Sequence, residues 1–565
     1  MIRFFPFLFT VIILLSGKNT PAQNWNWAKS IGDTTGNTAI YAMSPYPGSA
    51  VLVVGSYGSK TLELGSHTIS NNGIIDIFVA LADSSGTYQW AQGFGGTIEE
   101  RATAITADKN GNIYVLGNFS SLSVKFGSTT LYNKGESDGF LVKINAQKNV
   151  EWAMSFGGAT VDDMTGISTD NEGNVYVTGY TIDFQSNVFS MFVAKIDASK
   201  NILWKQTGNT AGWNLKTSSI VIDEEQNCYV AGGFSDVLSF DGKNQITSTK
   251  GGEPPYEYYD ENAFVVKFSK TGEFIQAMAI PTFSKVNDMA TFSSDLYLCG
   301  EKINYGIGWG WPLRDSKIFV SKFSNDLKPL WEQSAGGLTF MQSLDVANSI
   351  SADDEGNVYL TGSFFSEKLE FAGNSLMNFF NRDYYHQQTF VLKYDSNGNE
   401  LWGKAIGENL CEVGYQILAT SNNRYYLSGT FESNTIKFGE IALENNSNVR
   451  EVYVHLRPKR QSRNTFAFLA RHGTIEPSAN PIVKVNSTSI FPNPANNYFN
   501  IKLNESNHSG GKVSIYSHEG RLIQTLPINP DAMSLHVETG NLRNGIYVVK
   551  VKIGNNVSMH KVVKK

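Results

Sequence analysis

Several features that would place this chain in a familiar class of protein are scarce. It has only three cysteines and eight histidines among 565 residues. Charged residues make up 17% of the chain, compared with roughly 25% in an average soluble domain. Acidic residues outnumber basic ones, and the formal net charge is −6. These values argue against a disulfide framework and against the basic surface of a nucleic-acid-binding protein.

The short motifs of common catalytic and metal sites are also missing. No HExxH, GxSxG, P-loop or CxxC spacing occurs. Cys228 and Cys299 lie inside apolar runs, which favours buried hydrophobic roles over reactive ones. We therefore predict no bound metal, no cofactor and no catalytic activity.

Only one long apolar run is present, and it lies at the N-terminus. Arg3 precedes the apolar residues 4–15, and Thr20-Pro-Ala22 supplies small residues near a cleavage position. This order is typical of a secretory signal peptide, and the run is too short to span a bilayer. We predict a signal peptide over residues 1–22 and no transmembrane segment.

The rest of the chain is dominated by one pattern that recurs seven times. Its clearest copy, residues 164–208, contains four strand-like runs, which we call A, B, C and D. Run A ends in Asp, run B reads Val-Tyr-Val-Thr-Gly, run C reads Phe-Val-Ala-Lys, and run D is centred on Trp. Alternating apolar residues indicate strands, and Asp-x-x-Gly-Asn turns join A to B. Run B ends at Gly55, Gly117, Gly179, Gly232, Gly300, Gly362 and Gly429, run C begins at Phe78, Phe140, Phe192, Phe264, Phe319, Phe390 and Phe466, and run D carries Trp90, Trp152, Trp204, Phe274, Trp331 and Trp402.

Four strands per unit are typical of the blades of a β-propeller. The seventh unit lacks run D, whereas the mature N-terminus begins with an unassigned D-like run, Trp25 to Gly32. We predict that strand 25–31 lies antiparallel beside strand 464–470 and completes the last blade. The expected fold is all-β, a seven-bladed propeller over residues 23–472 that is closed by its N-terminal strand.

The units resemble the bacterial β-propeller repeat (SBBP-like) family, which shares the Gly-Asn-Val-Tyr-Val-Thr-Gly and Phe-Val-Ala-Lys signatures. The resemblance covers about residues 25–472 and implies the fold without implying an activity. Units four and five depart from the pattern, because Phe274 replaces Trp and Leu296–Gly300 lacks the preceding Gly-Asn turn.

A linker rich in Pro, Ser, Thr and Asn, residues 473–489, leads into a different C-terminal module. Strand-like runs over residues 490–565 predict a small antiparallel, Ig-like β-sandwich. The module resembles the type A C-terminal sorting domain of the type IX secretion system of Bacteroidetes. That resemblance implies export to the outer-membrane surface or the medium, with the type IX machinery as a partner; an Ig-like binding module is the alternative. The residues that carry it are Phe491, Pro492, Asn493, Pro494, Val513–Tyr516, Gly520–Arg521, Gly545–Val548, Lys564 and Lys565.

Three irregular insertions between runs B and C are candidates for ligand binding. They span residues 253–260, 305–312 and 378–386, in units four to six. Because successive blade strands alternate in direction, all B–C loops should emerge on one face, where amphipathic aromatics favour an extracellular glycan or protein ligand. The alternative is that the aromatics pack on their own blades. A basic insertion holds Arg457, Lys459, Arg460 and Arg463 and is either a solvated loop or a contact for an anionic glycan. The predicted ligand-binding residues are Tyr256, Tyr258, Tyr259, Trp309, Trp311, Tyr384 and Tyr385.

Two other patterns carry both a structural and a chemical interpretation. The pairs Glu99-Glu100 and Asp162-Asp163 follow run D, and we interpret them as solvated turn residues rather than facing catalytic carboxylates. The Asp-x-x-Gly-Asn turns lack the further ligands of a calcium loop. We therefore predict a secreted, non-catalytic binding protein; the alternative is a secreted hydrolase or lyase whose site lies on the face of the B–C and D–A loops.

Overall fold

The computed structural model describes two compact units, Met1–Ile475 and Glu476–Lys565. Within the described residues every regular element is a β-strand, so the fold is all-β as expected. No helix that could cross a membrane was found in the described part of the chain. The structure describes residues 25–565 apart from 184, 187, 211, 213, 252–257, 260, 281–283, 309–310, 337–344, 372, 379–385, 409, 421–423, 449, 455–456, 474–488, 503–510, 518–521, 530–531, 533 and 554–555. The predicted signal peptide lies outside these residues.

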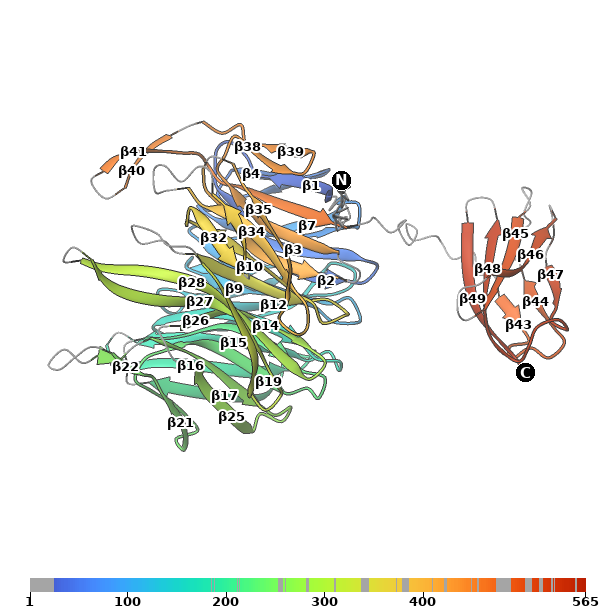
Figure 1. Ribbon diagram of the computed structural model, residues 1–565, viewed down its shortest axis with the longest axis horizontal. Helices are drawn as coiled ribbons and strands as arrows, with labels where there is room; N and C mark the ends of the chain where they lie inside the picture. Colours follow the sequence, from blue (N-terminus) through green and yellow to red (C-terminus); the bar gives the residue numbers. More distant parts are fainter. Residues whose placement is uncertain are drawn as a thin grey trace, which may run out of the picture. The chain divides into compact units, whose positions relative to one another are not determined.

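Seven antiparallel sheets with at least four strands each make up most of the larger unit (Figure 1). The third sheet has two further strands at its edge, β20 (Val237–Phe240) and β21 (Asn244–Thr247). We name the strands of each sheet A to D in the order in which they pair. The sheets are β2 (Thr38–Tyr46), β3 (Ala50–Tyr57), β6 (Asp76–Ala82), β7 (Tyr88–Phe94); β8 (Glu100–Ala107), β9 (Ile113–Phe119), β12 (Asp138–Ile144), β13 (Val150–Phe156); β14 (Val161–Thr169), β15 (Val175–Asp183), β16 (Val188–Ile196), β17 (Ile202–Thr210); β18 (Leu215–Ile222), β19 (Cys228–Phe234), β24 (Asn262–Phe268), β25 (Phe274–Ile280); β26 (Ser284–Phe292), β27 (Asp295–Gly308), β28 (Trp311–Phe323), β29 (Pro329–Ala335); β30 (Val346–Ala352), β31 (Val358–Phe364), β34 (Gln388–Tyr394), β35 (Glu400–Ile406); and β36 (Glu412–Ala419), β37 (Tyr425–Phe431), β42 (Phe466–His472), β1 (Trp25–Ile31).

The seventh sheet takes its D strand from the N-terminus. β1 pairs antiparallel with β42, from Trp25 opposite His472 to Ile31 opposite Ala467. The predicted pairing of strand 25–31 is therefore confirmed. In Figure 1, β1 lies in blue beside the orange strands of the end of this unit.

Tryptophans on four of the D strands join their sheet to the next one. Trp27 Nε1 donates a 2.9 Å hydrogen bond to the carbonyl oxygen of Ser84, in the C–D turn of the first sheet. Gly86 in that turn has φ +81°, and a Cβ there would lie 2.7 Å from the Trp27 ring, so only glycine fits. Trp27 thus occupies the place of the other D-strand tryptophans. The equivalent hydrogen bonds join Trp152 to Ala198, Trp204 to Lys270 and Trp331 to Ser396, each at 3.1 Å.

The lysine of the Phe-Val-Ala-Lys run is a buried structural cation. Lys195 Nζ lies 2.9 Å from Asp170 Oδ2 and 4.9 Å from the centre of the Tyr176 ring. A buried charge needs such a partner to offset its desolvation. Other lysines at this position donate to the next sheet's C–D turn, and Arg471 does so in the seventh sheet. These lysine bonds join Lys143 to Ala198 (3.0 Å), Lys267 to Asn325 (2.9 Å) and Lys322 to Ser396 (3.2 Å).

The Asp-x-x-Gly-Asn sequences form tight turns whose aspartates are fully engaged. Asp170 Oδ1 accepts hydrogen bonds from the backbone N–H groups of Glu172 and Asn174, both at 2.9 Å. Asp108 makes the same pair of bonds with Asn110 and Asn112. Because the turn supplies the donors for these oxygens, the arrangement supports the turn interpretation over a calcium loop.

Five short hairpins inside the B–C connections were not predicted. They are β4 (Thr61–Leu64) with β5 (His67–Ser70), β10 (Ser123–Phe126) with β11 (Thr129–Tyr132), β20 (Val237–Phe240) with β21 (Asn244–Thr247), β32 (Lys368–Phe371) with β33 (Asn374–Met377), and β38 (Thr435–Phe438) with β39 (Ile441–Glu444). Each first strand buries two alternate apolar residues, for example Val124 and Phe126. The first strand of each hairpin contacts the D strand of the preceding sheet, so the hairpins cover part of the junctions between sheets.

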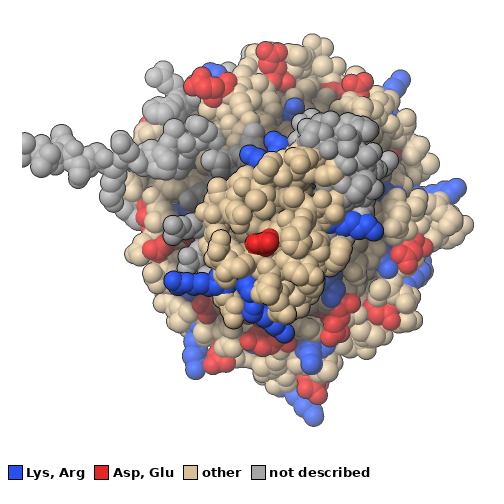
Figure 2. All heavy atoms as spheres, turned by 90° about the vertical axis from the view of Figure 1, so that its right-hand side faces the viewer, with Lys and Arg blue, Asp and Glu red and all other residues tan. Residues whose placement is uncertain are grey.

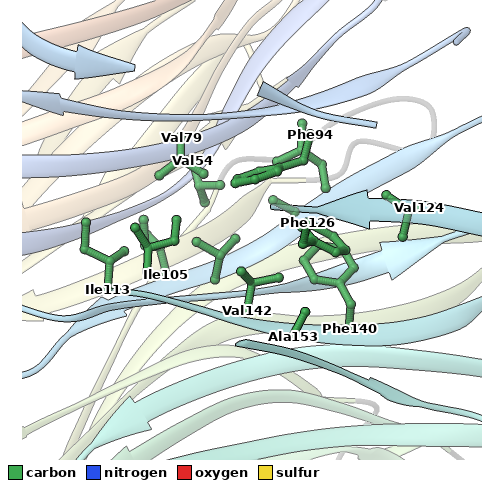
Figure 3. Packing of buried hydrophobic residues seen from close by; sticks show 14 of the residues in the cluster. Val54, Val79, Phe94, Ile105, Ile113, Val124, Phe126, Phe140, Val142 and Ala153 are labelled. Carbon is green, nitrogen blue, oxygen red and sulfur yellow. The ribbon is translucent and has the colours of Figure 1, made fainter. Parts of the chain in front are cut away.

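The hydrophobic core lies between neighbouring sheets. Figure 3 shows Val54 and Val79 of the first sheet packed towards Ile105 and Val142 of the second. Phe126, from the β10–β11 hairpin, packs into the same cluster. Each sheet therefore stabilises both of its neighbours, as in other repeat architectures.

Buried carboxylates hold the loops that lead into several A strands. Glu412, fully buried at the start of β36, accepts hydrogen bonds from Ser433 Oγ and from the backbone of Glu408. Burial raises its pKa to about 7, despite these hydrogen bonds, which lower it. In the preceding sheet, Asp345 accepts from the backbone of Phe365 and Ser366.

The smaller unit contains two sheets around one apolar core. One sheet has three strands, β43 (Ser489–Phe491), β44 (Tyr498–Lys502) and β47 (Ser534–Glu538), and the other has four, β46 (Leu522–Ile528), β45 (Gly511–Ser517), β48 (Gly545–Ile553) and β49 (Asn556–Lys564). Phe499 and Ile501 of the first sheet share a buried cluster with Ile515 and Val549 of the second.

Replacing Trp27 with alanine should destabilise the larger unit strongly. The side chain is only 7% exposed, and truncating a buried Trp costs about 3–5 kcal/mol. Deleting residues 24–32 should cost more, because it also unpairs β42. Chemical denaturation measures both losses, with Trp152→Ala as the matched internal control. A loss below about 1 kcal/mol for Trp27→Ala, the size of an ordinary substitution, would contradict the proposed role of β1.

Glu412 should make stability fall as the pH rises. Its carboxyl keeps its proton up to about pH 7 in the folded chain, whereas the usual pKa is 4.5. Between these values the folded state binds more protons, so the free energy of unfolding decreases with rising pH. Glu412→Gln should flatten this slope between pH 4.5 and 7, measured by denaturation at several pH values. An unchanged slope in the variant would refute the assignment.

Candidate functional site

Only three of the seven predicted ligand-binding aromatics lie within the described residues. Tyr258 and Tyr259 form β23, which pairs with β22 (Lys250–Gly251). Trp311 begins β28 and lies opposite Gly308 of β27. At the base of the third insertion, Asn378 Nδ2 donates to the carbonyl of His386 at 3.0 Å. Tyr256, Trp309, Tyr384 and Tyr385 lie outside the described residues.

The strand pairing places the B–C and D–A loops at the same end of the sheets. In each A–B pair the first residues of strand A lie opposite the last residues of strand B, for example Leu215 opposite Phe234. Figure 1 shows β22, the paired ends of β27 and β28, and the hairpin β40 (Arg450–Val454) with β41 (Arg457–Ser462) extending on one side of this unit. We call this end the loop face. The basic insertion, expected as a loop, thus forms a hairpin, and Arg463 next to it donates to the carbonyl of Ser447.

The A strands lie together at the centre of the larger unit. Each contacts the A strands of the two neighbouring sheets, and β36 of the seventh sheet contacts β2 of the first. Every A strand also has a β-bulge at the equivalent position, which leaves one residue without a partner in strand B. These seven half-buried residues are Tyr41, Thr103, Thr165, Ser218, Asn287, Asn348 and Tyr415.

Contacts of the bulge residues connect adjacent sheets. The rings of Tyr41 and Tyr415 meet edge to face with centres 5.5 Å apart, and Thr165 Oγ1 lies 2.6 Å from Thr217 Oγ1. Asn287 and Asn348 each donate from Nδ2 to a backbone carbonyl of the next A strand, at 2.8 Å. These bulge residues therefore contact the neighbouring A strands through an aromatic pair and through polar atoms.

In four of the seven A strands a charged residue lies two positions before the bulge, nearer the loop face. Asp163 accepts a 2.8 Å hydrogen bond from Tyr180 Oη, and Lys216 Nζ lies 6.0 Å from the centre of the Tyr180 ring. Burial, aided by Asp163, raises the pKa of Tyr180, so the phenol remains a donor. At the equivalent positions, Arg101 pairs with Glu99 and Lys285 lies 4.0 Å from Glu301. The sequence patterns did not reveal this cluster, because nothing in them marks the bulges.

None of the four carboxylates of the acidic pairs is exposed to solvent as expected: Glu99 and Asp163 are half-buried, and Glu100 and Asp162 are buried. Glu100 is fully buried and accepts hydrogen bonds from the backbone N–H groups of Gly96 (2.6 Å) and Ser121 (3.3 Å). Asp162 is 7% exposed and accepts from Gly158 N (2.8 Å) and Thr181 Oγ1 (2.8 Å). The prediction of solvated turn residues is wrong for these two, because each carboxylate fills a loop whose N–H groups need an acceptor.

A further carboxylate, Asp288, lies directly after the bulge of β26. It accepts hydrogen bonds from Ser219 Oγ and Ser349 Oγ, both at 2.9 Å, and so links the fourth, fifth and sixth sheets. Burial raises its pKa, opposed by the bonds it accepts. Among the described residues, no group of three or more His, Cys, Asp and Glu side chains is arranged to hold a metal ion.

The residues of the predicted sorting signal come together in the smaller unit. Asn493 Nδ2 donates to the carbonyl of Lys561 (2.6 Å), and its Oδ1 accepts from Val563 N (2.9 Å). Lys565 N donates to the carbonyl of Ala495 (2.9 Å), and Gly545 pairs with Lys564. The Phe-Pro-Asn-Pro segment and the basic terminus thus form one local structure. Phe491, next to them, is 49% exposed.

The surface charge is mixed. Around the part of the larger unit that is visible in Figure 2, Lys and Arg side chains are interspersed with Asp and Glu side chains. That view agrees with the small net charge of −6.

Comparisons with known proteins match two segments of the chain. A family described as "Secretion system C-terminal sorting domain" matches residues 489–565, and a "Beta-propeller repeat" family matches residues 151–184. An uncharacterized WD repeat-containing protein, L264, of Acanthamoeba polyphaga mimivirus is 20% identical over 410 residues, covering 65% of this chain. The match spans 27% of that relative's length.

Solved structures with weak similarity include two propeller-type domains. The Neurospora crassa Pan2 WD40 domain has a TM-score of 0.34 and 10% identity, with 79% of this chain and 90% of that one covered. The β-propeller domain of the Trilobed protease from Pyrococcus furiosus has a TM-score of 0.31 and 12% identity, with 68% and 97% covered.

The two family matches agree with the resemblances found in the sequence, in the clearest repeat unit and at the C-terminus. This chain carries a β-propeller repeat and ends in a type IX secretion-system C-terminal sorting domain, which marks it for export to the cell surface or the extracellular space.

Proposed function

We propose that the larger unit is a seven-bladed β-propeller closed by its N-terminal strand, and that it binds an extracellular glycan or peptide without catalysis. The smaller unit is then an Ig-like β-sandwich that engages the type IX machinery. The cyclic contacts of the seven A strands and the pairing of β1 with β42 support the ring. Closure of this kind protects sheet edges that would otherwise be exposed.

The extension of several B–C insertions from one side of the unit carries the binding proposal (Figure 1). The sequence of these insertions in the fourth and fifth sheets is rich in Tyr and Trp, including Tyr258 and Trp311. Such side chains combine a large apolar surface with a polar group, which suits recognition of sugars and peptides. The repeat supplies the rigid scaffold and the insertions supply the variable contacts.

The carboxylates near the loop face support binding over hydrolysis or lyase chemistry. Glu100 and Asp162 are buried and accept hydrogen bonds from their own loops. Asp163 is engaged by Tyr180 and Glu99 by Arg101. A pair of catalytic carboxylates needs room for substrate between them, whereas these groups serve the local structure.

Deleting residues 490–565 should leave the protein in the periplasm. The sorting segment and the basic terminus form one structure, so removing it removes the export signal while the Sec signal remains. Cell fractionation and surface labelling measure the distribution, with the full chain as control. Normal surface display of the truncated chain would refute the sorting role.

Aromatic residues of the insertions should contribute to affinity rather than to stability. A screen of the purified protein on a glycan array identifies the glycan to be used as probe. Trp309→Ala, Trp311→Ala and Tyr258→Ala should each weaken its binding at least tenfold, as for central aromatic contacts, with nearly unchanged melting. Tyr132→Ala, at an exposed tyrosine outside the insertions, is the matched control. Loss of stability equal to the loss of binding would show that the three residues pack within the fold.

A further inference from the structure

A small cavity lies where the third and fourth sheets meet, beside the turn of the β20–β21 hairpin. It has a volume of about 320 Å³, at the lower end of the range of about 300–1,000 Å³ for ligand sites. Strands β17, β21 and β25, which border this cavity, lie together at one edge of the larger unit in Figure 1. We call it the hairpin cavity. Because β25 begins beside it and runs towards the D–A loop, the cavity lies towards the end of the sheets opposite the loop face.

Three phenylalanines form the apolar part of the cavity lining. Phe240 and Phe268 are 1% and 2% exposed, and Phe274 is half-buried. The centre of the Phe274 ring lies 5.6 Å from that of Phe240 and 6.3 Å from that of Phe268. The rings therefore form one continuous apolar surface, of which Phe274 has the largest part in contact with solvent.

The hairpin beside the cavity differs from the other four. Three residues separate its paired Phe240 and Asn244, whereas two residues form the turn in each of the others. Among the described hairpins it alone also pairs with the preceding D strand, β17. In the first sheet a Cβ on the turn residue Gly65 would lie 3.9 Å from Tyr88, the first residue of its D strand. In the fourth sheet the first residue of the D strand is Phe274, and it borders the cavity instead.

Two exposed carboxylates, Asp241 and Glu273, also line the cavity, and neither belongs to the repeat pattern. Asp241 is the first residue of its hairpin turn, where the other hairpins have Gly65, Gly127, Ala372 and Gly439. The backbone bond from Ser269 N to Glu273 O recurs in the C–D turns and identifies the equivalents of Glu273, which are Thr87, Asn149, Asn201, Lys328 and Asn399. Two separate departures from the repeat therefore bring acidic side chains to one cavity.

The two carboxylates differ in how the fold uses them. Asp241 Oδ1 accepts hydrogen bonds from the backbone N–H groups of Lys243 and Asn244, both at 3.1 Å. The bond from Asn244 N contributes most to lowering the pKa of this carboxyl, which is therefore charged at neutral pH. In the described part of the chain, no hydrogen bond or ion pair engages the side chain of Glu273, whereas Asn201 at the equivalent position bonds within its own turn.

The charge of the cavity is negative. None of the residues that line it is basic. Lys243, in the same turn, lies close enough to Asp241 to help lower the pKa of that carboxyl. One lysine offsets only one of the two carboxylates, so a negative charge remains beside an apolar surface. A ligand that fits this combination has a cationic group at the end of an aliphatic chain.

We infer that the hairpin cavity binds a basic side chain, lysine or arginine, of a peptide or protein partner. The carboxylates of Asp241 and Glu273 attract its cationic group through charge-assisted hydrogen bonds. The aliphatic stem covers Phe274, whose ring face also favours a cation. A sugar fits less well, because Phe240 and Phe268 expose almost no ring surface on which it could stack. The inference does not rest on the proposed binding at the loop face, from which the cavity is separate.

Titration of the full chain with model compounds tests the inference. The basic probes are the N-methylamides of N-acetyl-lysine and N-acetyl-arginine, and the N-methylamide of N-acetyl-norleucine supplies an aliphatic stem without the charge. Saturation-transfer NMR measures binding. We expect at least one basic probe to bind saturably, the neutral probe to bind at least tenfold more weakly, and high salt to weaken the binding of the basic probe.

Variants of the two acidic residues locate the binding. Asp241→Asn and Glu273→Gln remove the charge with little change of shape, and each should weaken binding of the basic probe at least tenfold, as expected for loss of a hydrogen bond to a charged group. Glu440→Gln, at an exposed acid in the turn of the β38–β39 hairpin, is the matched control and should bind normally, as should Trp311→Ala in a B–C insertion. The melting temperature of Glu273→Gln should equal that of the wild type, because the side chain is exposed.

Several outcomes would overturn the inference. They are the absence of saturable binding of both basic probes, equal binding of the norleucine probe, binding that neither acidic variant weakens, and a lower melting temperature of Glu273→Gln. Glucosamine is titrated in parallel. If it binds more tightly than both basic probes, the cavity is a site for an amino sugar instead. None of these results affects the loop-face proposal, which the aromatic variants test separately.

Discussion

The stability of the larger unit depends on contacts between the D strand of one sheet and the C–D turn of the next sheet. In three of these contacts the indole ring covers a glycine of the turn (Gly86, Gly272 or Gly398), and the indole N–H donates to a carbonyl of the same turn. At the Trp152 contact the equivalent residue with positive φ is Lys200. A buried lysine or arginine of strand C reaches that turn in several sheets. Trp152 and Lys143 of the second sheet donate hydrogen bonds to the carbonyl of Ala198 in the third sheet. In the same way, Trp27 and Arg471 of the seventh sheet donate to the carbonyl of Ser84 in the first sheet.

Polar groups that enter the interior are satisfied locally, and this organises the loop face. Glu100, Asp162 and Glu412 accept hydrogen bonds from the loops that lead into their A strands. The loops next to the centre are therefore anchored, whereas the B–C insertions extend outwards and vary between sheets. Such a division between a fixed scaffold and variable connections suits a protein that recognises a ligand.

Candidate functional positions in this chain are most visible where the sequence departs from its own repeat. The aromatic insertions interrupt the pattern in the fourth to sixth units. A repeat thus provides its own reference: a side chain needed for packing recurs, as Trp204 and Lys195 do, and one that does not recur needs another reason.

The sequence alone determined the all-β fold, the repeat units, the sorting domain and the pairing of residues 25–31 with the last unit. These features could be predicted because strand periodicity, and the absence of one strand from the last unit, are visible in local sequence patterns. It did not reveal the five B–C hairpins, whose short strands gain stability only against neighbouring D strands. Nor did it reveal the bulges of the A strands, the contacts of Tyr180 with Asp163 and Lys216, or the burial of Glu100 and Asp162. Only the tertiary structure decided these features, since burial and register depend on residues that are distant in the chain.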